Sequence, residues 1–545
     1  MPKPITRNTL FYGDNLAILR EYIPPESIDL IYLDPPFNSN RSYNVLFKDE
    51  SGTASEAQLT AFDDTWHWGP TAEETYFDLV NHASAGIAKM ISALRDFIGS
   101  NQMMAYLVMM AARLVELHRV LKPTGSLYLH CDPTASHYLK IVLDTIFGFQ
   151  NFRNEITWKR TTAHNDPTRY GNVHDVLLYY SKTNQCTWNA VFSEHSEEYK
   201  ARFRHSDPDG RLWTDGDLTA KGLSGGGYEY TYKGCTSLWR VPIETMKRLD
   251  DEGRLYFTRN NGIRIKRYLD ETPGIPPQDV ITDIFPINSQ AAERLGYPTQ
   301  KPLALLERII QASSNPGDII LDPFSGCGTA ISAAQKLNRR WIGIDITHLA
   351  IAMHKARLKD MFNLEPGKDY DVIGEPLDLT SARQLAQDDR YQFQWWALSL
   401  VKAKPVGGES TSKKGRKGSD RGIDGIIPFI DDPKGKTSTA IVQVKSGHVK
   451  SGDIRDLIGT VQNQEAAFGI FITLEEPTPE MITAASQAGF YHSPIWQEKY
   501  PRIQILTIAE LLGGATVQMP RFSTATFKRA PRVKKSTGEQ AELDL

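Results

Sequence analysis

Residues 318–329 read Asp-Ile-Ile-Leu-Asp-Pro-Phe-Ser-Gly-Cys-Gly-Thr, and this stretch decides the fold. Its apolar half predicts a buried strand that ends at Asp322, and a helix is predicted to follow through Leu337. Gly326 and Gly328, in the turn between them, let a ligand approach the backbone, and a helix N-terminus favours a carboxylate or phosphate. The stretch therefore predicts one strand–turn–helix step of an α/β sheet with a ligand-binding loop.

The next predicted strand, residues 341–344, ends on Asp345, which lies 19 residues after Gly326. An acidic side chain about 20 residues after such a loop commonly accepts hydrogen bonds from ribose hydroxyls. This spacing favours a nucleotide-like ligand. A GxG loop alone does not identify the ligand, and a tight turn that only packs helix on strand is the alternative.

A second motif, Asp34-Pro35-Pro36-Phe37, ends the apolar run of residues 28–33. Two prolines make the turn rigid and fix the direction of the carbonyl before them. A carboxylate, a fixed carbonyl and an aromatic face then suit an exocyclic amine, because Asp34 and the carbonyl accept its two N–H groups while Phe37 stacks on the ring. A plain loop between two elements is the alternative reading.

The composition is that of a globular protein without a membrane span. Of the 545 residues, 40% are hydrophobic and 23% are charged, and the net charge of −3 gives no global preference for nucleic acid. The longest apolar run is about half the roughly 20 residues needed to cross a bilayer, and Met1-Pro2-Lys3-Pro4 has no signal-peptide core. The four cysteines lie far apart, which disfavours disulfides and Cys-based zinc sites. We therefore expect a cytoplasmic protein.

Three to four folding units are expected at about 150 residues per domain. A strand–helix–strand rhythm near the N-terminus and again around Asp322 predicts one α/β sheet made from two parts of the chain. The residues between them are rich in Gly, aromatic and basic side chains and predict an insertion. The predicted boundaries are 1–158 and 289–375 for the two parts of the sheet domain, 159–288 for the insertion, 376–388 for a linker, 389–515 for a C-terminal domain, and 516–545 for a flexible tail.

Together these motifs resemble the beta subgroup of DNA amino-methyltransferases, which use S-adenosylmethionine. Tyr12-Gly13-Asp14-Asn15-Leu16 precedes the Asp34 motif, and Tyr297-Pro298-Thr299-Gln300-Lys301-Pro302 precedes the glycine loop, in the subgroup's order. The resemblance covers residues 1 to about 375. It implies a Rossmann-like methyltransferase sheet with an inserted target-recognition domain that binds double-stranded DNA. It leaves the oligomeric state open, with a dimer as one option.

The resemblance also implies roles for individual residues. Phe324, Gly326 and Gly328 would shape the cofactor pocket together with Asp322, and Asp345 would hold the ribose. Asp14 would hold the cofactor's adenine amine, and Lys301 would lie near its carboxylate end. Asp34, Pro35, Pro36 and Phe37 would hold the flipped target base, and Asp rather than Ser at the first motif position favours adenine N6 over cytosine N4.

The insertion carries aromatic residues among cations, a mixture that suits phosphate contacts and base stacking. For any one of these aromatic residues, burial in an ordinary hydrophobic core is as good an interpretation as contact with DNA. The residues are Trp158, Lys159, Arg160, Tyr170, Phe203, Arg204, Trp213, Tyr230, Tyr232, Trp239 and Arg240.

The C-terminal part predicts a hairpin whose strands bring Asp424 near Gln443 and Lys445. Gln443 and Lys445 share a strand face, and with Asp424 they form a candidate Mg²⁺ site in which Asp424 and Gln443 are the ligands. The arrangement resembles the Mrr-type branch of the PD-(D/E)xK nucleases. Gln394 stands where related nucleases often carry Glu, which puts metal affinity in doubt.

The sequence thus predicts a methyltransferase fused to a Mg²⁺-dependent endonuclease. Four alternatives stay open: a C-terminal domain that only binds DNA, cytosine N4 as the acceptor, methylation of RNA or of a protein amide, and a DNA clamp without catalysis.

Overall fold

The structure is a computed structural model. It describes residues 4–36, 68–163, 166–220, 227–288, 291–295, 297, 299–406, 423–431, 437–520 and 531–532. It also describes the backbone of a separate antiparallel hairpin, β3 (Ser42–Lys48) with β4 (Ala54–Asp63). Within these residues, no helix is long and apolar enough to span a membrane.

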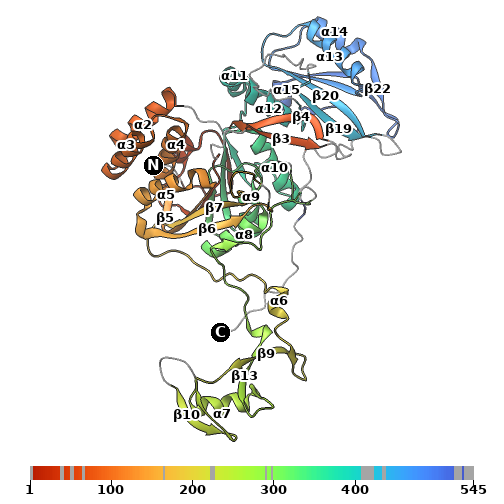
Figure 1. The fold of residues 1–545 in the computed structure, drawn as a ribbon. Coiled ribbons are helices and arrows are strands. Elements are labelled where there is room, and N and C mark those ends of the chain that lie inside the picture. Colours follow the sequence, from red (N-terminus) through yellow and green to blue (C-terminus); the bar gives the residue numbers. More distant parts are fainter. Residues whose placement is uncertain are drawn as a thin grey trace. The chain divides into compact units, whose positions relative to one another are not determined.

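A mixed nine-stranded sheet organises the first part of the chain, in the order β14-β6-β7-β5-β2-β15-β16-β1-β17. Figure 1 labels its strands β5, β6 and β7. Its strands are β1 (Thr9–Tyr12), β2 (Ile28–Leu33), β5 (Leu121–Cys131), β6 (Phe152–Lys159), β7 (His174–Ser181), β14 (Val280–Ile281), β15 (Ile319–Asp322), β16 (Arg340–Asp345) and β17 (Asp371–Ile373). The predicted Rossmann-like α/β sheet is confirmed.

The two strands that carry the motifs are parallel neighbours. Leu30 of β2 pairs with Ile320 of β15, and Ile31 pairs with Leu321. Because parallel strands end at the same edge of a sheet, the turn after β2 and the glycine loop after β15 emerge side by side. Segments that lie 288 residues apart in the chain therefore meet at one edge.

Both faces of the sheet are buried, and β2 shows why. Ile31 and Leu33 enter one core cluster, while Leu30 and Tyr32 enter the cluster on the opposite face. Alternate residues of a strand point to opposite faces, so this strand needs apolar residues at nearly every position. The helices of this part are α1 (Asn15–Tyr22), α2 (Pro70–His82), α3 (Ala85–Ile98), α4 (Gln102–Val120), α5 (Pro133–Phe147), α8 (Leu303–Ser313), α9 (Thr329–Lys336) and α10 (His348–Phe362), with a 3₁₀ turn η1 (Phe149–Asn151).

The insertion is a separate compact unit, Ala190–Gln278. It is shorter than the predicted 159–288, because β6 and β7 belong to the large sheet, where β7 pairs antiparallel with β5. The unit contains a four-stranded sheet of β8 (His205–Ser206), β9 (Leu212–Asp217), β12 (Leu255–Phe257) and β13 (Ile263–Tyr268), a hairpin of β10 (Tyr228–Tyr232) and β11 (Cys235–Trp239), and the helices α6 (Glu197–Lys200), α7 (Ile243–Asp251) and η2 (Leu269–Glu271).

The C-terminal part is built on a five-stranded sheet in the order β18-β19-β20-β21-β24. Its strands are β18 (Lys404–Pro405), β19 (Gly425–Ile430), β20 (Thr437–Lys445), β21 (Phe468–Thr473) and β24 (Ile503–Thr507), with a small hairpin of β22 (Phe490–His492) and β23 (Lys499–Pro501). Its helices are α11 (Leu379–Asp388), α12 (Arg390–Leu400), α13 (Ser451–Asn463), α14 (Pro479–Gln487) and α15 (Ile508–Leu512). This α/β fold agrees with the predicted one.

Two predicted boundaries of this part are wrong. Residues 376–388 are not a linker, because α11 occupies them, with Asp378 capping its N-terminus and Ala382 buried in the core. The predicted tail from residue 516 begins too early, since the backbone N–H of Gln518 donates to Gln504 Oε1 at 2.8 Å.

Candidate active site

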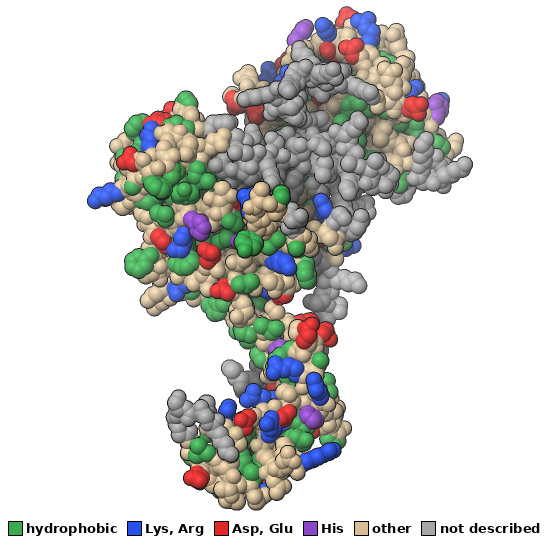
Figure 2. All heavy atoms as spheres, in the orientation of Figure 1, with side chains coloured by type: hydrophobic (Ala, Val, Ile, Leu, Met, Phe, Trp, Pro, Cys, Tyr) green, Lys and Arg blue, Asp and Glu red, His purple; other side chains and the backbone are tan. Residues whose placement is uncertain are grey.

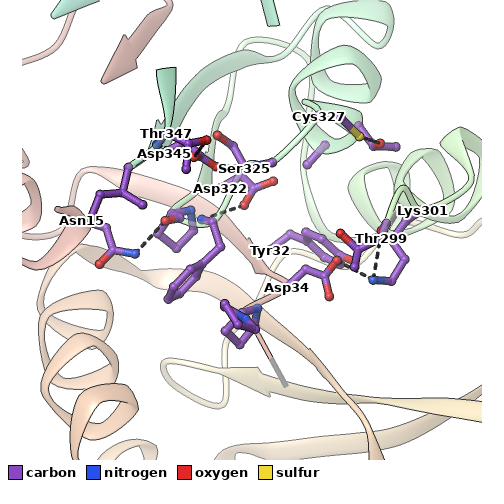
Figure 3. Close-up of a pocket in the computed structure, with 18 of the residues that line it drawn as sticks. Asn15, Tyr32, Asp34, Thr299, Lys301, Asp322, Ser325, Cys327, Asp345 and Thr347 are labelled. Carbon is purple, nitrogen blue, oxygen red and sulfur yellow. Dashed lines mark hydrogen bonds and ion pairs between the residues drawn. The ribbon is translucent and has the colours of Figure 1, made fainter. Parts of the chain in front are cut away.

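One cavity lies where the turn after β2 meets the glycine loop after β15. Asp34, Pro35 and Pro36 line it together with Gly326, so both predicted motifs share one cleft. Figure 3 shows Tyr32, Asp34 and Lys301 at one side of this pocket, and Asn15, Asp345 and Thr347 at the other. Phe37, predicted to stack on a base, lies outside the described residues.

The glycine loop has a backbone that only glycine adopts easily. Gly326 has φ +48° and Gly328 has φ +76°, both in the left-handed region. A Cβ at Gly328 would lie 2.6 Å from Nδ1 of His354, and one at Gly326 would lie 3.3 Å from the ring of Tyr297. The loop therefore fits closely between α10 and Tyr297 and has no room for side chains at these two positions.

Asp345 holds this loop from the end of β16. Its Oδ2 accepts a hydrogen bond from the Gly326 backbone N–H at 2.9 Å, and its Oδ1 accepts from the backbone and hydroxyl of Thr347. Burial raises the pKa of Asp345 to about 6, although these hydrogen bonds oppose the rise. Oδ2 can accept a second hydrogen bond, so a ribose contact stays a prediction for this residue.

The turn after β1 is tied to the same loop. Asn15 Nδ2 donates to the Pro323 carbonyl at 2.8 Å, and the Gly13 backbone N–H donates to the Asp345 carbonyl at 2.9 Å. Arg113 on α4 donates to Asp14 Oδ1 at 2.6 Å and to Asn15 Oδ1 at 2.5 Å. Asp14 caps α1 and lines the cavity, and its contact with an adenine amine stays a prediction.

Lys301 forms an ion pair with Asp34, a contact that the sequence did not predict. Its Nζ donates to Asp34 Oδ2 at 2.5 Å, and both side chains are largely buried. Lys301 also lines the cavity, and its place near a cofactor carboxylate stays a prediction. The ion pair fixes the Asp34 carboxylate at the end of β2, although 267 residues separate the two in the chain.

Asp322 lies behind the pair at the end of β15. Burial raises its pKa well above the ordinary value, and the nearby carboxylates Asp34 and Asp345 add to the rise. Its Oδ1 accepts from the Phe324 backbone N–H at 3.1 Å, which shapes the start of the loop. Asp322 is thus a structural part of the pocket floor.

The described lining fits a cationic nucleoside such as S-adenosylmethionine. Four of its residues are acidic (Asp14, Asp34, Asp322 and Asp345) and two are basic (Arg113 and Lys301). The left-handed glycines form a cradle that a Cβ would fill, and carboxylates at both ends can accept from an amine and from hydroxyls. Sequence reasoning missed Tyr32, Arg113 and Thr347, because only the fold brings them to the cavity.

The aromatic residues predicted to touch DNA divide by burial. Trp158 of β6, and Phe203, Trp213 and Trp239 of the insertion, are buried in cores, so the alternative reading is correct for them. Tyr230 and Tyr232 are half-buried, and Tyr170, which lies outside unit Ala190–Gln278, is exposed.

In the insertion, Tyr228 and Phe257 are exposed, and Lys233 Nζ lies 5.4 Å from the ring centre of Phe257. Figure 2 shows Lys and Arg side chains on the visible face of this unit.

In the C-terminal part, the structure brings Asp424 to α12 and β20. Asp424 Oδ1 accepts from Gln394 Nε2 at 3.0 Å, and its Oδ2 accepts from the Val444 backbone N–H at 2.7 Å. Gln443 is buried beside them on β20, with Lys445 two residues further along the same face.

This set does not fit the predicted Mg²⁺ site. Both oxygens of its one carboxylate, Asp424, already accept from N–H donors, and the side chains at the other two positions are the carboxamides of Gln394 and Gln443. Among the described residues, no three His, Cys, Asp or Glu side chains are grouped to hold a metal. We therefore derive no metal-dependent step from this region.

Two family models match separate parts of the chain. A family model described as DNA methylase matches residues 28–355, and one described as NACHT-associated inactive Restriction Endonuclease 1 matches residues 407–513. The Type II methyltransferase M.EcaI of Enterobacter cloacae is 27% identical over 389 residues, which cover 69% of this chain and 75% of that protein.

Other similar proteins share less of their length or of their sequence. The Type III restriction-modification enzyme StyLTI Mod subunit of Salmonella typhimurium is 28% identical over 352 residues, which cover 61% of this chain but only 50% of that protein. Among solved structures, a putative DNA modification methylase of Thermus thermophilus in complex with S-adenosyl-L-methionine has a TM-score of 0.32 and 15% identity, covering 68% of this chain and 99% of that one.

Proposed function

Since the chain belongs to the DNA methylase family of N6 and N4 methyltransferases, we propose that it transfers a methyl group from S-adenosylmethionine to the exocyclic amine of a DNA base. One observation carries this proposal: Asp34 and the glycine loop around Gly326 line the same cavity from neighbouring parallel strands. An amine held at Asp34 then lies in the cleft that also suits the cofactor.

The residues divide the chemistry between them. When bound, S-adenosylmethionine supplies an electrophilic methyl group on a sulfonium. An exocyclic amine is a poor nucleophile because its lone pair is conjugated with the ring. Asp34 Oδ1 and a carbonyl of the rigid Pro35-Pro36 turn accept the two N–H groups, which directs the lone pair toward the methyl, while Lys301 keeps the Asp34 carboxylate in place. The base leaves the duplex at a cost of a few kcal/mol.

We favour adenine N6 as the acceptor. The support is the sequence motif, in which Asp34 occupies the position where Ser is more typical of cytosine-N4 enzymes. The named relatives suggest a place in a restriction–modification system, with double-stranded DNA as the substrate. The unit Ala190–Gln278 is proposed to recognise the target, with Tyr228, Phe257 and Lys233 on its exposed surface.

For the C-terminal part we propose DNA binding without cleavage, one of the alternatives to the predicted Mrr-type, Mg²⁺-dependent endonuclease. Two observations support this choice. Asp424 is the one carboxylate in the predicted metal site, the other positions are the amides of Gln394 and Gln443, and each Asp424 oxygen already accepts a hydrogen bond. The matching family is described as inactive. Incubation of plasmids, both methylated and unmethylated, with the protein and Mg²⁺ tests this choice, and any Mg²⁺-dependent cut that Asp424→Ala abolishes would overturn it.

The methyl-transfer proposal is tested with radiolabelled S-adenosylmethionine and duplex DNA, followed by digestion to nucleosides. N6-methyladenine is the expected product, and N4-methylcytosine would select the alternative acceptor. Asp34→Ala should lower transfer by at least about 10²-fold, the typical effect of removing one preorganised acceptor or donor from an active site. Cofactor binding measured by calorimetry should remain. No transfer to any DNA by the wild-type protein would refute the proposal.

A further inference from the structure

Three buried polar side chains form a row on adjacent strands behind Asp34. Tyr32 of β2, His130 of β5 and Asp175 of β7 are each at most 2% exposed. The Tyr32 hydroxyl lies 2.9 Å from His130 Nδ1, and His130 Nε2 lies 3.1 Å from Asp175 Oδ2. Because β2, β5 and β7 are successive in the sheet, one continuous hydrogen-bonded chain crosses three strands on one face.

The direction of these hydrogen bonds follows from the charge of Asp175. Burial alone would raise its pKa, but the hydrogen bond from His130 and the charges of Lys301 and Arg160 outweigh burial and lower it. Asp175 is therefore a carboxylate, so His130 carries its proton on Nε2 and donates to it. Nδ1 is then the acceptor, and the Tyr32 hydroxyl donates to Nδ1. This leaves the Tyr32 oxygen free to accept a hydrogen bond.

The two ends of the row have different surroundings. Tyr32 lines the same cavity as Asp34 and lies beside it in Figure 3. At the other end, Arg160 Nη1 lies 3.2 Å from Asp175 Oδ1, and the Arg160 side chain is 45% exposed. This row of hydrogen bonds thus leads from the candidate base site to a cation at the surface. Its residues make no hydrogen bond given above to the glycine loop or to the Asp34 carboxylate.

Resting on the proposed function, we infer that Tyr32, His130 and Asp175 form a relay that removes the proton released by methyl transfer. When the amine nitrogen forms its bond to the methyl carbon, the carbon–sulfur bond breaks and the electron pair stays on sulfur. The nitrogen becomes positively charged and must lose one proton. Asp34 Oδ1 keeps one N–H, and the other is released by the turn carbonyl to the Tyr32 oxygen, which accepts that proton while its own proton passes to His130 Nδ1.

Charge and protons are conserved in this step. The base is a neutral methylamine, the cofactor product is a neutral thioether, Tyr32 is again a phenol, and His130 is an imidazolium that Asp175 stabilises. Asp34 is a poorer final acceptor in this geometry because its Oδ2 already accepts from Lys301 Nζ at 2.5 Å. His130, in contrast, offers a neutral ring nitrogen with a carboxylate behind it, the arrangement that makes imidazole an effective base.

Tyr32→Phe tests the relay with a matched control. The variant removes only the hydroxyl that links the cavity to His130. Tyr128→Phe is the control, because Tyr128 is an equally buried tyrosine on the neighbouring strand whose hydroxyl bonds to Ser313 Oγ at 2.7 Å, outside the cavity. In single-turnover assays we expect Tyr32→Phe to lower the transfer rate by about 10²-fold, within the usual range for general acid–base groups. Tyr128→Phe should keep the wild-type rate.

Asp175→Asn supplies a readout that a purely structural role would not change. The relay delivers a proton to His130 beside the Asp175 carboxylate, so the pH profile of the single-turnover rate should change when the Asp175 charge is lost. The charged groups that face this region are Asp34 after β2, Asp322 at the end of β15, Asp132 after β5, Glu155 on β6, Asp175 on β7, Arg160 after β6 and Lys301 before α8. In nitrogen NMR of the ligand-free, histidine-labelled protein, wild-type His130 should carry its proton on Nε2, and Asp175→Asn should change that.

The outcomes separate the two proposals. A wild-type protein that transfers no methyl refutes the proposed function itself. A wild-type protein that transfers methyl, with Tyr32→Phe equal to it in rate and pH profile, refutes the relay alone. Equal losses in Tyr32→Phe and Tyr128→Phe, accompanied by equal drops in melting temperature, would also overturn the relay, since both would then reflect lost core packing.

Discussion

Replacing Gly328 with alanine should disturb the glycine loop in two separable ways. The backbone there has φ +76°, which costs an L-residue about 1–2 kcal/mol. The new methyl group would also lie 2.6 Å from Nδ1 of His354, a fully buried side chain that cannot move away easily. Overpacking of this kind adds about 1–3 kcal/mol. The expected total is roughly 2–5 kcal/mol of lost stability, together with weaker cofactor binding.

Gly317→Ala is the matched control. Its φ of +88° carries the same backbone penalty, but no atom lies within 4 Å of the added Cβ. Denaturation by guanidinium chloride, followed by circular dichroism, should give a lower midpoint for Gly328→Ala than for Gly317→Ala. Midpoints are compared rather than absolute free energies, because a chain with more than one unit need not unfold in one step.

The reasoning can be checked further with His354→Ala. Removing the imidazole makes space for the methyl group, so the double variant Gly328→Ala/His354→Ala should lose less stability than the sum of the two single variants. If Gly328→Ala is no less stable than Gly317→Ala, or if the double variant is strictly additive, the close contact between loop and α10 does not limit this position.

Three other predictions concern the same cavity and the C-terminal site. Asn15→Ala removes the hydrogen bond to the Pro323 carbonyl, which is worth about 0.5–1.5 kcal/mol. Calorimetry should therefore show cofactor affinity weakened by up to about tenfold. An unchanged affinity would show that this hydrogen bond does not hold the loop for the cofactor. The pKa of Asp345, about 6 in the folded protein, lies above its ordinary value; stability from its protonated form is therefore present at low pH and lost as pH rises through about 6. The melting temperature of the wild type relative to Asp345→Asn should decline between pH 4 and 7, and a constant difference would contradict this. Gln443→Glu places a second carboxylate beside Asp424, so the variant should bind Mg²⁺ measurably while the wild type does not. Mg²⁺ binding by both proteins would show that the wild-type site already holds the metal.

The sequence predicted the local motifs well because each depends on a short stretch with its own chemistry. The apolar run before Asp34 and the glycine turn after Asp322 both lie at strand ends, and the expectation that they share a cleft is supported by the cavity. Placing these motifs needed only the rule that parallel strands end at a common edge.

The contacts that the sequence did not predict depend on partners far along the chain. Nothing near Lys301 in the sequence shows that its ammonium meets Asp34, and the row of Tyr32, His130 and Asp175 exists only because β2, β5 and β7 are neighbours. The predicted insertion starts too early because it takes in β7, although Val-Leu-Leu-Tyr-Tyr at 176–180 is a strong strand signal.

The position of β1 in the sheet has a consequence for synthesis on the ribosome. Thr9 pairs with Ile342 of β16 on one side and with Asp371 of β17 on the other. β1 therefore has no native strand neighbour until more than 330 further residues have been made, a wait of tens of seconds at about 5–20 residues per second. Its exposed edges must stay unpaired with other nascent strands through that interval, so we expect the yield of folded protein to depend on elongation speed and on chaperones that cover the N-terminal segment.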